Sequence, residues 1–178
     1  DTLKKLSEGA LDPFVRSQAL ATLFQIAPAD ATGILPKLLG SKDQVVVERA
    51  LEIAFHQMDN RGIRELVVGL SRSGDPGIRL KAAMALGQSV DPEAIAAMVE
   101  IYADPNADSY LISVIQSGIH QENLRVFTRK FLEVMNGSGD KLGGRLEALW
   151  SMASGQKNPT VLNDSIDYLL RSANLSLI

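Results

Sequence analysis

The side chains that most often carry catalysis or bind metal are scarce in this chain. It contains two histidines, His56 and His120, and no cysteine among its 178 residues. A zinc site needs three or four ligands that converge on one point, and thiol chemistry needs a cysteine. Neither an HxH nor an HExxH spacing occurs, so we expect both histidines to cap helix ends or to lie on the surface. The sequence therefore predicts no catalytic residue, no metal site, no cofactor and no enzymatic activity.

A glycine-rich stretch has part of the spacing of a phosphate-binding loop. Gly139 and Gly144 are separated as in GxxxxG, but Arg145-Leu146 stands where that loop carries Lys followed by Ser or Thr. An apolar strand also precedes such a loop, and no strand pattern precedes this one. We therefore expect a loop between two helical units, at which a stack of helices could bend.

Cationic side chains on two predicted helices are the candidate binding residues. The helix expected at residues 60–73 carries three cations against one carboxylate, and the helix expected at residues 121–136 carries three against two. The helix between them, at residues 91–103, has only acidic charges, so no continuous basic track exists for a phosphate backbone. We expect the cations to bind a protein partner and not nucleic acid: Arg61, Arg64, Arg72, Arg125, Arg129 and Lys130.

The composition agrees with a helical protein that binds other proteins. Hydrophobic residues make up 46% of the chain and aromatic residues only 5%, so the core must be largely aliphatic. The formal net charge of −3 gives no electrostatic reason to expect nucleic acid or an anionic membrane as partner. No apolar run approaches the roughly 18 residues of a membrane-spanning helix, so direct membrane insertion is not expected.

Helix start signals recur at a nearly constant interval along the chain. Asp12, Asp43, Asp75 and Asp108 each precede an apolar stripe with helical spacing, at intervals of 31 to 33 residues. Aspartate at such a position accepts the free backbone N–H groups of the first turn. Each interval has room for two helices, which can bury their stripes only against neighbouring hairpins.

This periodicity predicts an all-α, right-handed superhelical solenoid of about five hairpins. We expect one domain, residues 1–178, in which residues 1–9 are the remaining helix of a preceding repeat. In the second helix of the first repeat we expect Pro36 near the first turn, where proline is tolerated. The five predicted repeats are residues 12–40, 43–73, 75–103, 108–136 and 141–171.

Two segments carry a resemblance to a known repeat family. DPFVRSQALATL (residues 12–23) and DPGIRLKAAMALG (residues 75–87), the latter followed by DPEAIAAMVEIY, resemble HEAT repeats of the short type also found in phycobilisome-lyase-like proteins. The resemblance covers residues 12–171. It implies that second helices line a concave face and that an Asp–Arg ladder, here Asp12/Arg16 and Asp75/Arg79, sets the stacking. Each pair would combine an N-cap with an ion pair, either along the helix or to the next repeat.

The match is weaker in two repeats. Val47 stands where the second repeat would carry the ladder arginine, and DSYLISVIQSGI in the fourth repeat lacks it too. That segment and DPGIRLKAAMALG also resemble the HEAT segment of large planctomycete-type proteins, which combine it with a membrane-bound dehydrogenase propeller and a cytochrome c-like domain. This resemblance implies an exported or periplasmic location. The haem motif is absent here, so no redox function is expected.

The sequence thus predicts a non-catalytic protein-interaction or scaffolding module that is a segment of a larger multidomain protein. Its partner would be another protein or neighbouring domains of the same chain. The resemblance leaves two alternatives: a chromophore-lyase-like protein on a HEAT scaffold, and a nucleic-acid-binding protein. The scarcity of Cys, His and aromatic residues argues against the first, and the alternating charge of the second helices argues against the second.

Overall fold

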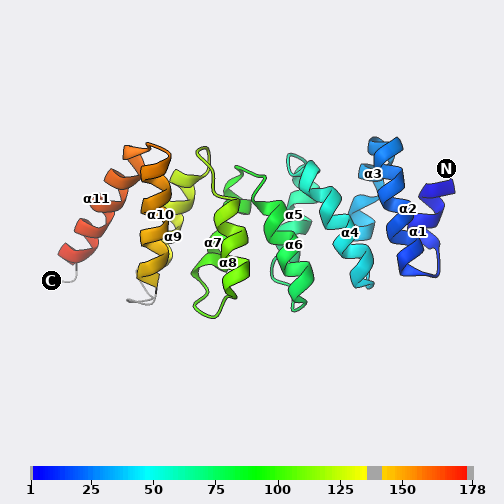
Figure 1. Cartoon of the computed structure of the whole chain (residues 1–178), viewed down its shortest axis with the longest axis horizontal. Coiled ribbons are helices and arrows are strands. Elements are labelled where there is room, and N and C mark those ends of the chain that lie inside the picture. Colours follow the sequence, from blue (N-terminus) through cyan, green and yellow to red (C-terminus); the bar gives the residue numbers. More distant parts are fainter. Residues whose placement is uncertain (1, 136–141, 176–178) are drawn as a thin grey trace. The chain divides into compact units, whose positions relative to one another are not determined.

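The structure is a computed structural model that describes residues 2–135 and 142–175. Within these ranges the regular structure consists of eleven α-helices and one short 3-10 helix, without a strand (Figure 1). The predicted all-α helical-repeat class is confirmed. Among the described residues, no helix combines the length and the apolar character that crossing a membrane requires.

The contacts divide the chain into two compact units, Asp1–Ser89 (unit 1) and Val90–Ile178 (unit 2). In unit 1, α2, α4 and α6 pack in series, α3 packs against α5, and α1 packs against α2 and α3. The unit is therefore a stack of helical hairpins, the arrangement of an α-solenoid (Figure 1). Its helices are α1 (Thr2–Gly9), α2 (Pro13–Ile26), α3 (Pro28–Leu39), α4 (Gln44–Ala54), the 3-10 helix η1 (Phe55–Gln57), α5 (Arg61–Leu70) and α6 (Pro76–Leu86).

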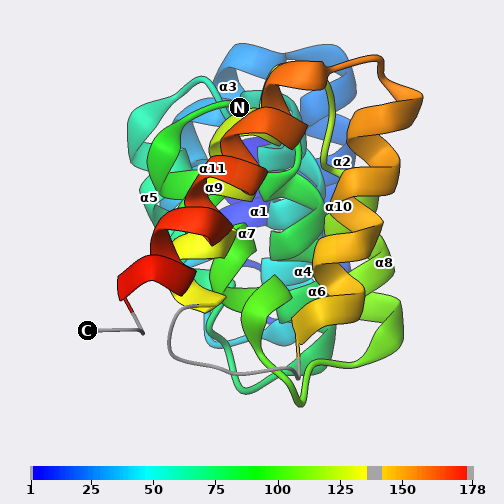
Figure 2. The same cartoon turned by 90° about the vertical axis from the view of Figure 1, so that its left-hand side faces the viewer.

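Unit 2 repeats this arrangement. Its helix α9 packs against α7, α10 and α11, while α8 packs against α7 and α10 against α11. Figure 2 shows α9, α10 and α11 from the side of the last hairpin. The helices of this unit are α7 (Pro92–Ala103), α8 (Ser109–Ser117), α9 (Leu124–Met135), α10 (Gly143–Gly155) and α11 (Pro159–Leu175). The division into units falls between α6 and α7, and the expected single domain with its five repeat boundaries stays a prediction.

Aspartate side chains cap the start of four of these helices. Asp12 accepts a hydrogen bond from the backbone N–H of Phe14 at 2.7 Å, and Asp75 accepts one from Ile78 at 2.9 Å. Asp91 and Asp108 do the same for α7 and α8. Each bond satisfies one of the N–H groups that a first turn leaves free, so these starts are set by local sequence.

Side chains of successive first helices also pair between repeats. Arg16 of α2 donates to Asp43, before α4, at 2.5 Å, so its ion pair reaches the next repeat. In α4, where Val47 replaces the arginine, Gln44 donates to Asp75 at 3.2 Å. Arg79 instead donates to the backbone carbonyl of Ser73. The ladder between α2, α4 and α6 is therefore kept with one change of chemistry.

The expectation for Pro36 is wrong. Helix α3 begins at Pro28, so Pro28 occupies the first turn and Pro36 lies inside the helix. Only Ala27 separates α3 from the end of α2, which makes the connection too short for the start that we expected farther along. Pro36 is exposed, so the carbonyl that loses its helical hydrogen bond lies on the solvent side of α3.

Candidate binding groove on helices α9 and α11

Helix α9 presents a cationic face because its apolar residues face the core of unit 2. Leu124, Phe127 and Phe131 are fully buried. Arg125 and Arg129, one turn apart on the opposite side of the helix, are exposed. Residues four apart lie on the same side of a helix. The sequence LRVFTRKFLEVM therefore folds into a helix with one apolar and one basic side.

Tyr102 of α7 is buried and packs against α9. Its ring packs edge-on against Phe127 and Phe131, with centroids 5.4 and 5.2 Å away. Its hydroxyl donates to the backbone carbonyl of Arg145 in α10 at 3.0 Å and accepts from the Gln116 amide at 3.3 Å. Burial raises the pKa of Tyr102 above 10.0, although the Gln116 hydrogen bond and the Arg145 charge oppose the shift. Tyr102 thus joins α7 to α8, α9 and α10.

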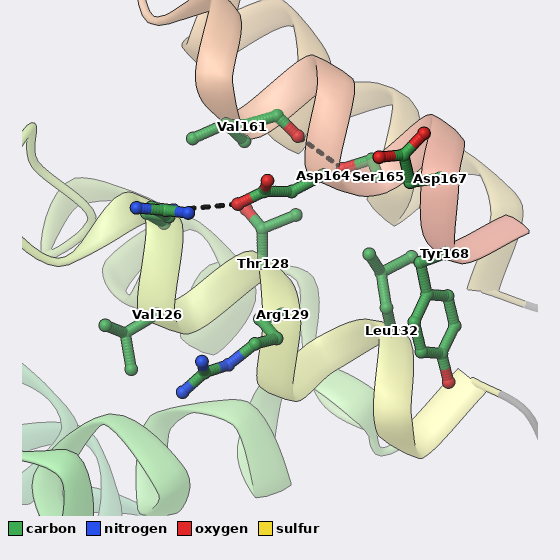
Figure 3. Close-up of a pocket in the computed structure, with 10 residues that line it drawn as sticks. Val126, Thr128, Arg129, Leu132, Val161, Asp164, Ser165, Asp167 and Tyr168 are labelled. Carbon is green, nitrogen blue, oxygen red and sulfur yellow. Dashed lines mark hydrogen bonds and ion pairs between the residues drawn. The ribbon is translucent and has the colours of Figure 1, made fainter.

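A pocket of about 450 Å³ opens between α9 and α11 (Figure 3). The apolar side chains Leu132 and Val161 form part of its wall, and Tyr168 lies beside Leu132. Charged side chains of both signs surround this apolar part. The groove is defined by Arg125, Arg129, Leu132, Val161, Asp164 and Tyr168.

The charges of the groove are unequally compensated. Arg125 donates to Asp164 at 2.7 Å, with side chains 62% and 44% exposed, so solvent screens the pair and its contribution is about 0.2–1 kcal/mol. Arg129 is directed away from this pair in Figure 3 and forms no ion pair with any residue that the structure describes. Lys130, the next residue, also lacks a carboxylate partner within residues 2–135 and 142–175. A binding partner can therefore supply a carboxylate to these two cations.

Two hydroxyl groups beside the groove behave differently. Ser165 donates to the backbone carbonyl of Val161 at 2.7 Å and is fully buried. Thr128 is 2% exposed, and its hydroxyl oxygen has no hydrogen-bond partner in the described part of the chain. Among the described residues, neither hydroxyl forms a hydrogen bond with a histidine or a carboxylate side chain.

The six predicted cations fall into two groups. Arg125, Arg129 and Lys130 share α9 of unit 2, and the groove brings the first two together with α11. The others belong to unit 1. Arg61 pairs with Glu65 at 2.7 Å on the surface of α5, Arg64 donates to the backbone carbonyl of Met58 at 2.9 Å, and Arg72 is exposed just beyond α5.

The acidic side of the groove was not predicted from the sequence. Asp164 and Tyr168 are four residues apart on α11, a spacing that places them on one face of a helix. This spacing was the available signal. It could not show that the face lies against α9, because Arg125 and Asp164 are 39 residues apart.

The histidines occupy separate places near helix ends. His56 lies between Phe24 and Phe55 in unit 1, with ring centroids 5.8 and 5.1 Å away. His120 lies in the turn before α9 in unit 2, where its backbone N–H donates to Asn123 at 2.9 Å. No group of three or more His, Asp or Glu side chains suited to a metal ion occurs among the described residues. Most of the predicted glycine-rich loop, residues 136–141, lies outside them.

Comparison with known proteins supports the repeat architecture. Residues 49–117, from α4 to α8, match the family model of HEAT repeats. The crystal structure of an engineered protein from the Northeast Structural Genomics Consortium is similar over 98% of this chain and 94% of that chain, with a TM-score of 0.55 and 19% sequence identity. At this identity the likeness concerns the fold alone. No curated protein matches the chain, and the phycobilisome-lyase-like and planctomycete-type resemblances stay predictions.

Proposed function

We propose that the chain is a non-catalytic protein-interaction module and that the groove of α9 and α11 is a binding surface for a segment of a partner protein. The observation that carries this proposal is that Arg129 lines the groove and has no ion-pair partner among the described residues. Stacked helical repeats offer extended surfaces of this kind to protein partners. No catalytic chemistry is needed for this role.

The lining of the groove indicates the chemistry of the partner. Leu132 and Val161 favour an apolar side chain, while Arg129 favours a carboxylate in the same segment. Asp164 and Asp167 on the opposite side would repel a phosphate backbone. We infer a partner segment that combines acidic and apolar residues, and we do not favour nucleic acid.

The cations of unit 1 are proposed as a separate part of the interaction surface. Arg61 is 80% exposed, and Arg72 is exposed at the end of α5. Pairing of Arg61 with Glu65 reduces its net attraction for an acidic partner. We therefore expect these cations to contribute less to binding than Arg129 does.

We further propose that the module is a segment of a larger multidomain protein, whose neighbouring domains are additional partners. The support is an exposed apolar surface on α1 and α2, at which further helical structure could pack. This part of the proposal does not depend on the groove.

Peptide selection followed by calorimetry tests the groove. Random peptides are selected on the whole chain, and we expect acidic-apolar sequences whose affinity falls about tenfold in Arg129→Glu, since one interface charge contributes roughly 1.4 kcal/mol. The matched control is Lys157→Glu, the same charge reversal at an exposed turn of unit 2, which should leave the affinity unchanged. Peptides that bind both variants equally, or retention of the chain on heparin at physiological salt, would contradict the proposal.

A further inference from the structure

Helices α1 and α2 form an apolar surface at one end of unit 1. Phe14 is 66% exposed, Val15 43% and Leu6 39%, and no residue that the structure describes covers them. A shallow groove of about 390 Å³ runs between the two helices at this place. We call this surface the end face and define it by Leu3, Leu6, Asp12, Phe14, Val15 and Gln18.

In the next repeat, the position equivalent to Val15 is covered. Helices α2 and α4 align on the aspartates that precede them, Asp12 and Asp43. The third residue after the aspartate is Val15 in α2 and Val46 in α4. Val46 is completely buried, whereas Val15 is 43% exposed. The exposure of the valine at this position therefore depends on whether a preceding first helix packs on it.

The tenth residue after each aspartate shows the same difference. Ile53 in α4 is 3% exposed and Ala85 in α6 is completely buried, whereas Thr22 in α2 is exposed. Helix α2 covers α4, and α4 covers α6. The end face on α2 is thus the surface on which a preceding first helix would lie.

Polar contacts at the repeat positions identify what such a helix supplies. The aspartate accepts from the preceding first helix: Asp43 from Arg16, and Asp75 from Gln44. Among the described residues, the side chain of Asp12 accepts only from the N–H of Phe14, in the first turn of its own helix, and Asp12 is exposed. By analogy, an arginine or glutamine side chain of a preceding first helix would donate a hydrogen bond to Asp12.

The sixth residue after each aspartate also reaches back to the preceding first helix. Arg49 donates to Ser17 at 3.3 Å, and Lys81 pairs with Glu52 at 2.6 Å. The equivalent residue of α2 is Gln18, which is exposed. The end face therefore repeats the polar positions of the ladder as well as its apolar ones.

Helix α1 occupies the position of the second helix of a hairpin. It packs against α2 and α3, just as α3 packs against α4 and α5. In this arrangement, the first helix that belongs with α1 would cover α2. The groove between α1 and α2 lies where that helix would enter.

We propose that the end face is the docking surface for the first helix of a hairpin whose second helix is α1. The occupant is an amphipathic helix with an apolar stripe of small and branched side chains and with an arginine or glutamine directed at Asp12. The last hairpin of a second copy fits less well, because the exposed residues of α10 include Glu147, Ser151 and Ser154. The inference concerns the proposed larger protein and is independent of the groove on α9 and α11.

A fusion of the whole chain tests this inference. A copy of residues 12–26 is joined ahead of α1 by a short glycine-serine linker, so that its arginine can reach Asp12 as Arg16 reaches Asp43. Hydrogen exchange should show protection of the added helix and increased protection of α2. The substitution Val15→Lys in the original α2 should raise the unfolding constant of the fusion about tenfold or more, but that of the unfused chain by only about twofold, because Val15 is exposed there.

Ile26→Lys is the control, since Ile26 is 69% exposed on α2 outside the end face and should affect both proteins equally. An added helix that exchanges freely, or a Val15→Lys effect that is equal in both proteins, would overturn the inference. Sedimentation of the unfused chain tests the other occupant: a dimer that Val15→Lys dissociates would show that a second copy covers the face. Peptide binding at the groove is measured on the same proteins, so the outcomes of the two proposals can be distinguished.

Discussion

At the scale of single residues, Tyr102 of α7 contacts both α9 and α10. Its buried ring fills the space against Phe127 and Phe131, and its hydroxyl reaches the backbone of Arg145. The guanidinium of Arg145 lies 5.8 Å from the centre of the same ring and donates to the carbonyl of Asp104 at 2.8 Å. Because burial raises the pKa of Tyr102, the folded state favours its neutral form.

Tyr102→Phe should therefore change both stability and its dependence on pH. Near neutral pH we expect a loss of about 1 kcal/mol, because the hydroxyl no longer donates to the Arg145 carbonyl. In the wild type, the unfolded state ionises Tyr102 from pH 10.0 and the folded state only at higher pH, so this part of the stability falls as the pH rises through that range.

Urea unfolding at pH 7 to 11, followed by circular dichroism, measures the effect. The wild type should lose stability above pH 10 more steeply than the Tyr102→Phe variant. The control is Tyr110→Phe, because Tyr110 is 65% exposed and its removal should leave the profile unchanged. Parallel profiles of the wild type and Tyr102→Phe would show that burial of this hydroxyl does not affect its ionisation.

At the scale of helices, the stacking of α2, α4 and α6 depends on close approach as well as on ion pairs. Gly77, in the first turn of α6, faces α4: a Cβ atom added there would lie 2.7 Å from a carboxylate oxygen of Glu48. That carboxylate accepts from Gln44, the residue that also donates to Asp75. Gly77 therefore leaves room for the contacts that replace the ladder arginine.

Gly33→Ala and Gly77→Ala should have different effects. Gly33 lies within α3, and an added Cβ there meets no atom within 4 Å, so alanine should raise the unfolding free energy by about 0.5–1 kcal/mol. Gly77→Ala must displace the Glu48 carboxylate, so we expect a smaller gain or a loss. Urea midpoints of the two variants measure this difference. An equal gain from both would show that the approach of α4 to α6 at Gly77 imposes no steric constraint.

At the scale of the whole molecule, each of the two units has its own buried core. Leu35 is completely buried in unit 1 and Phe131 in unit 2. In repeat proteins, each hairpin makes its contacts with its neighbours, so stability is distributed along the chain. We therefore expect a cavity to reduce protection first in the unit that contains it.

Phe131→Ala and Leu35→Ala form a matched pair for this expectation. Each removes a completely buried side chain, at a cost of roughly 3–5 and 2–5 kcal/mol respectively. Hydrogen exchange measured by mass spectrometry should show faster exchange chiefly in α7, α9 and α11 for Phe131→Ala, and in α2, α3 and α4 for Leu35→Ala. Equal loss of protection over both units in both variants would instead indicate that the chain unfolds as one cooperative body.

The sequence by itself determined where most helices begin and which residues they bury. Capping by Asp12, Asp75 and Asp108 depends on N–H groups two or three residues away, so local spacing is sufficient to predict it. The apolar stripes of α4 and α9 follow from helical periodicity in the same way. The sequence did not predict the start of α3 at Pro28, because Ala27 provides no side-chain cap. Pro36, which lies inside the helix, was expected near its first turn instead.

The tertiary structure decided which side chains meet. Arg16 pairs with Asp43, 27 residues later, and Arg125 pairs with Asp164, 39 residues later. It also decided that Val15 is exposed and Val46 is buried, although the two occupy equivalent positions. Val46 is covered by α2, and the described residues include no helix that covers Val15 in the same way. Ion pairs and burial depend on how helices pack, and one helix's sequence does not specify its neighbour. For this reason the groove on α9 and α11 and the end face on α1 and α2 could be identified only from the tertiary structure of each unit.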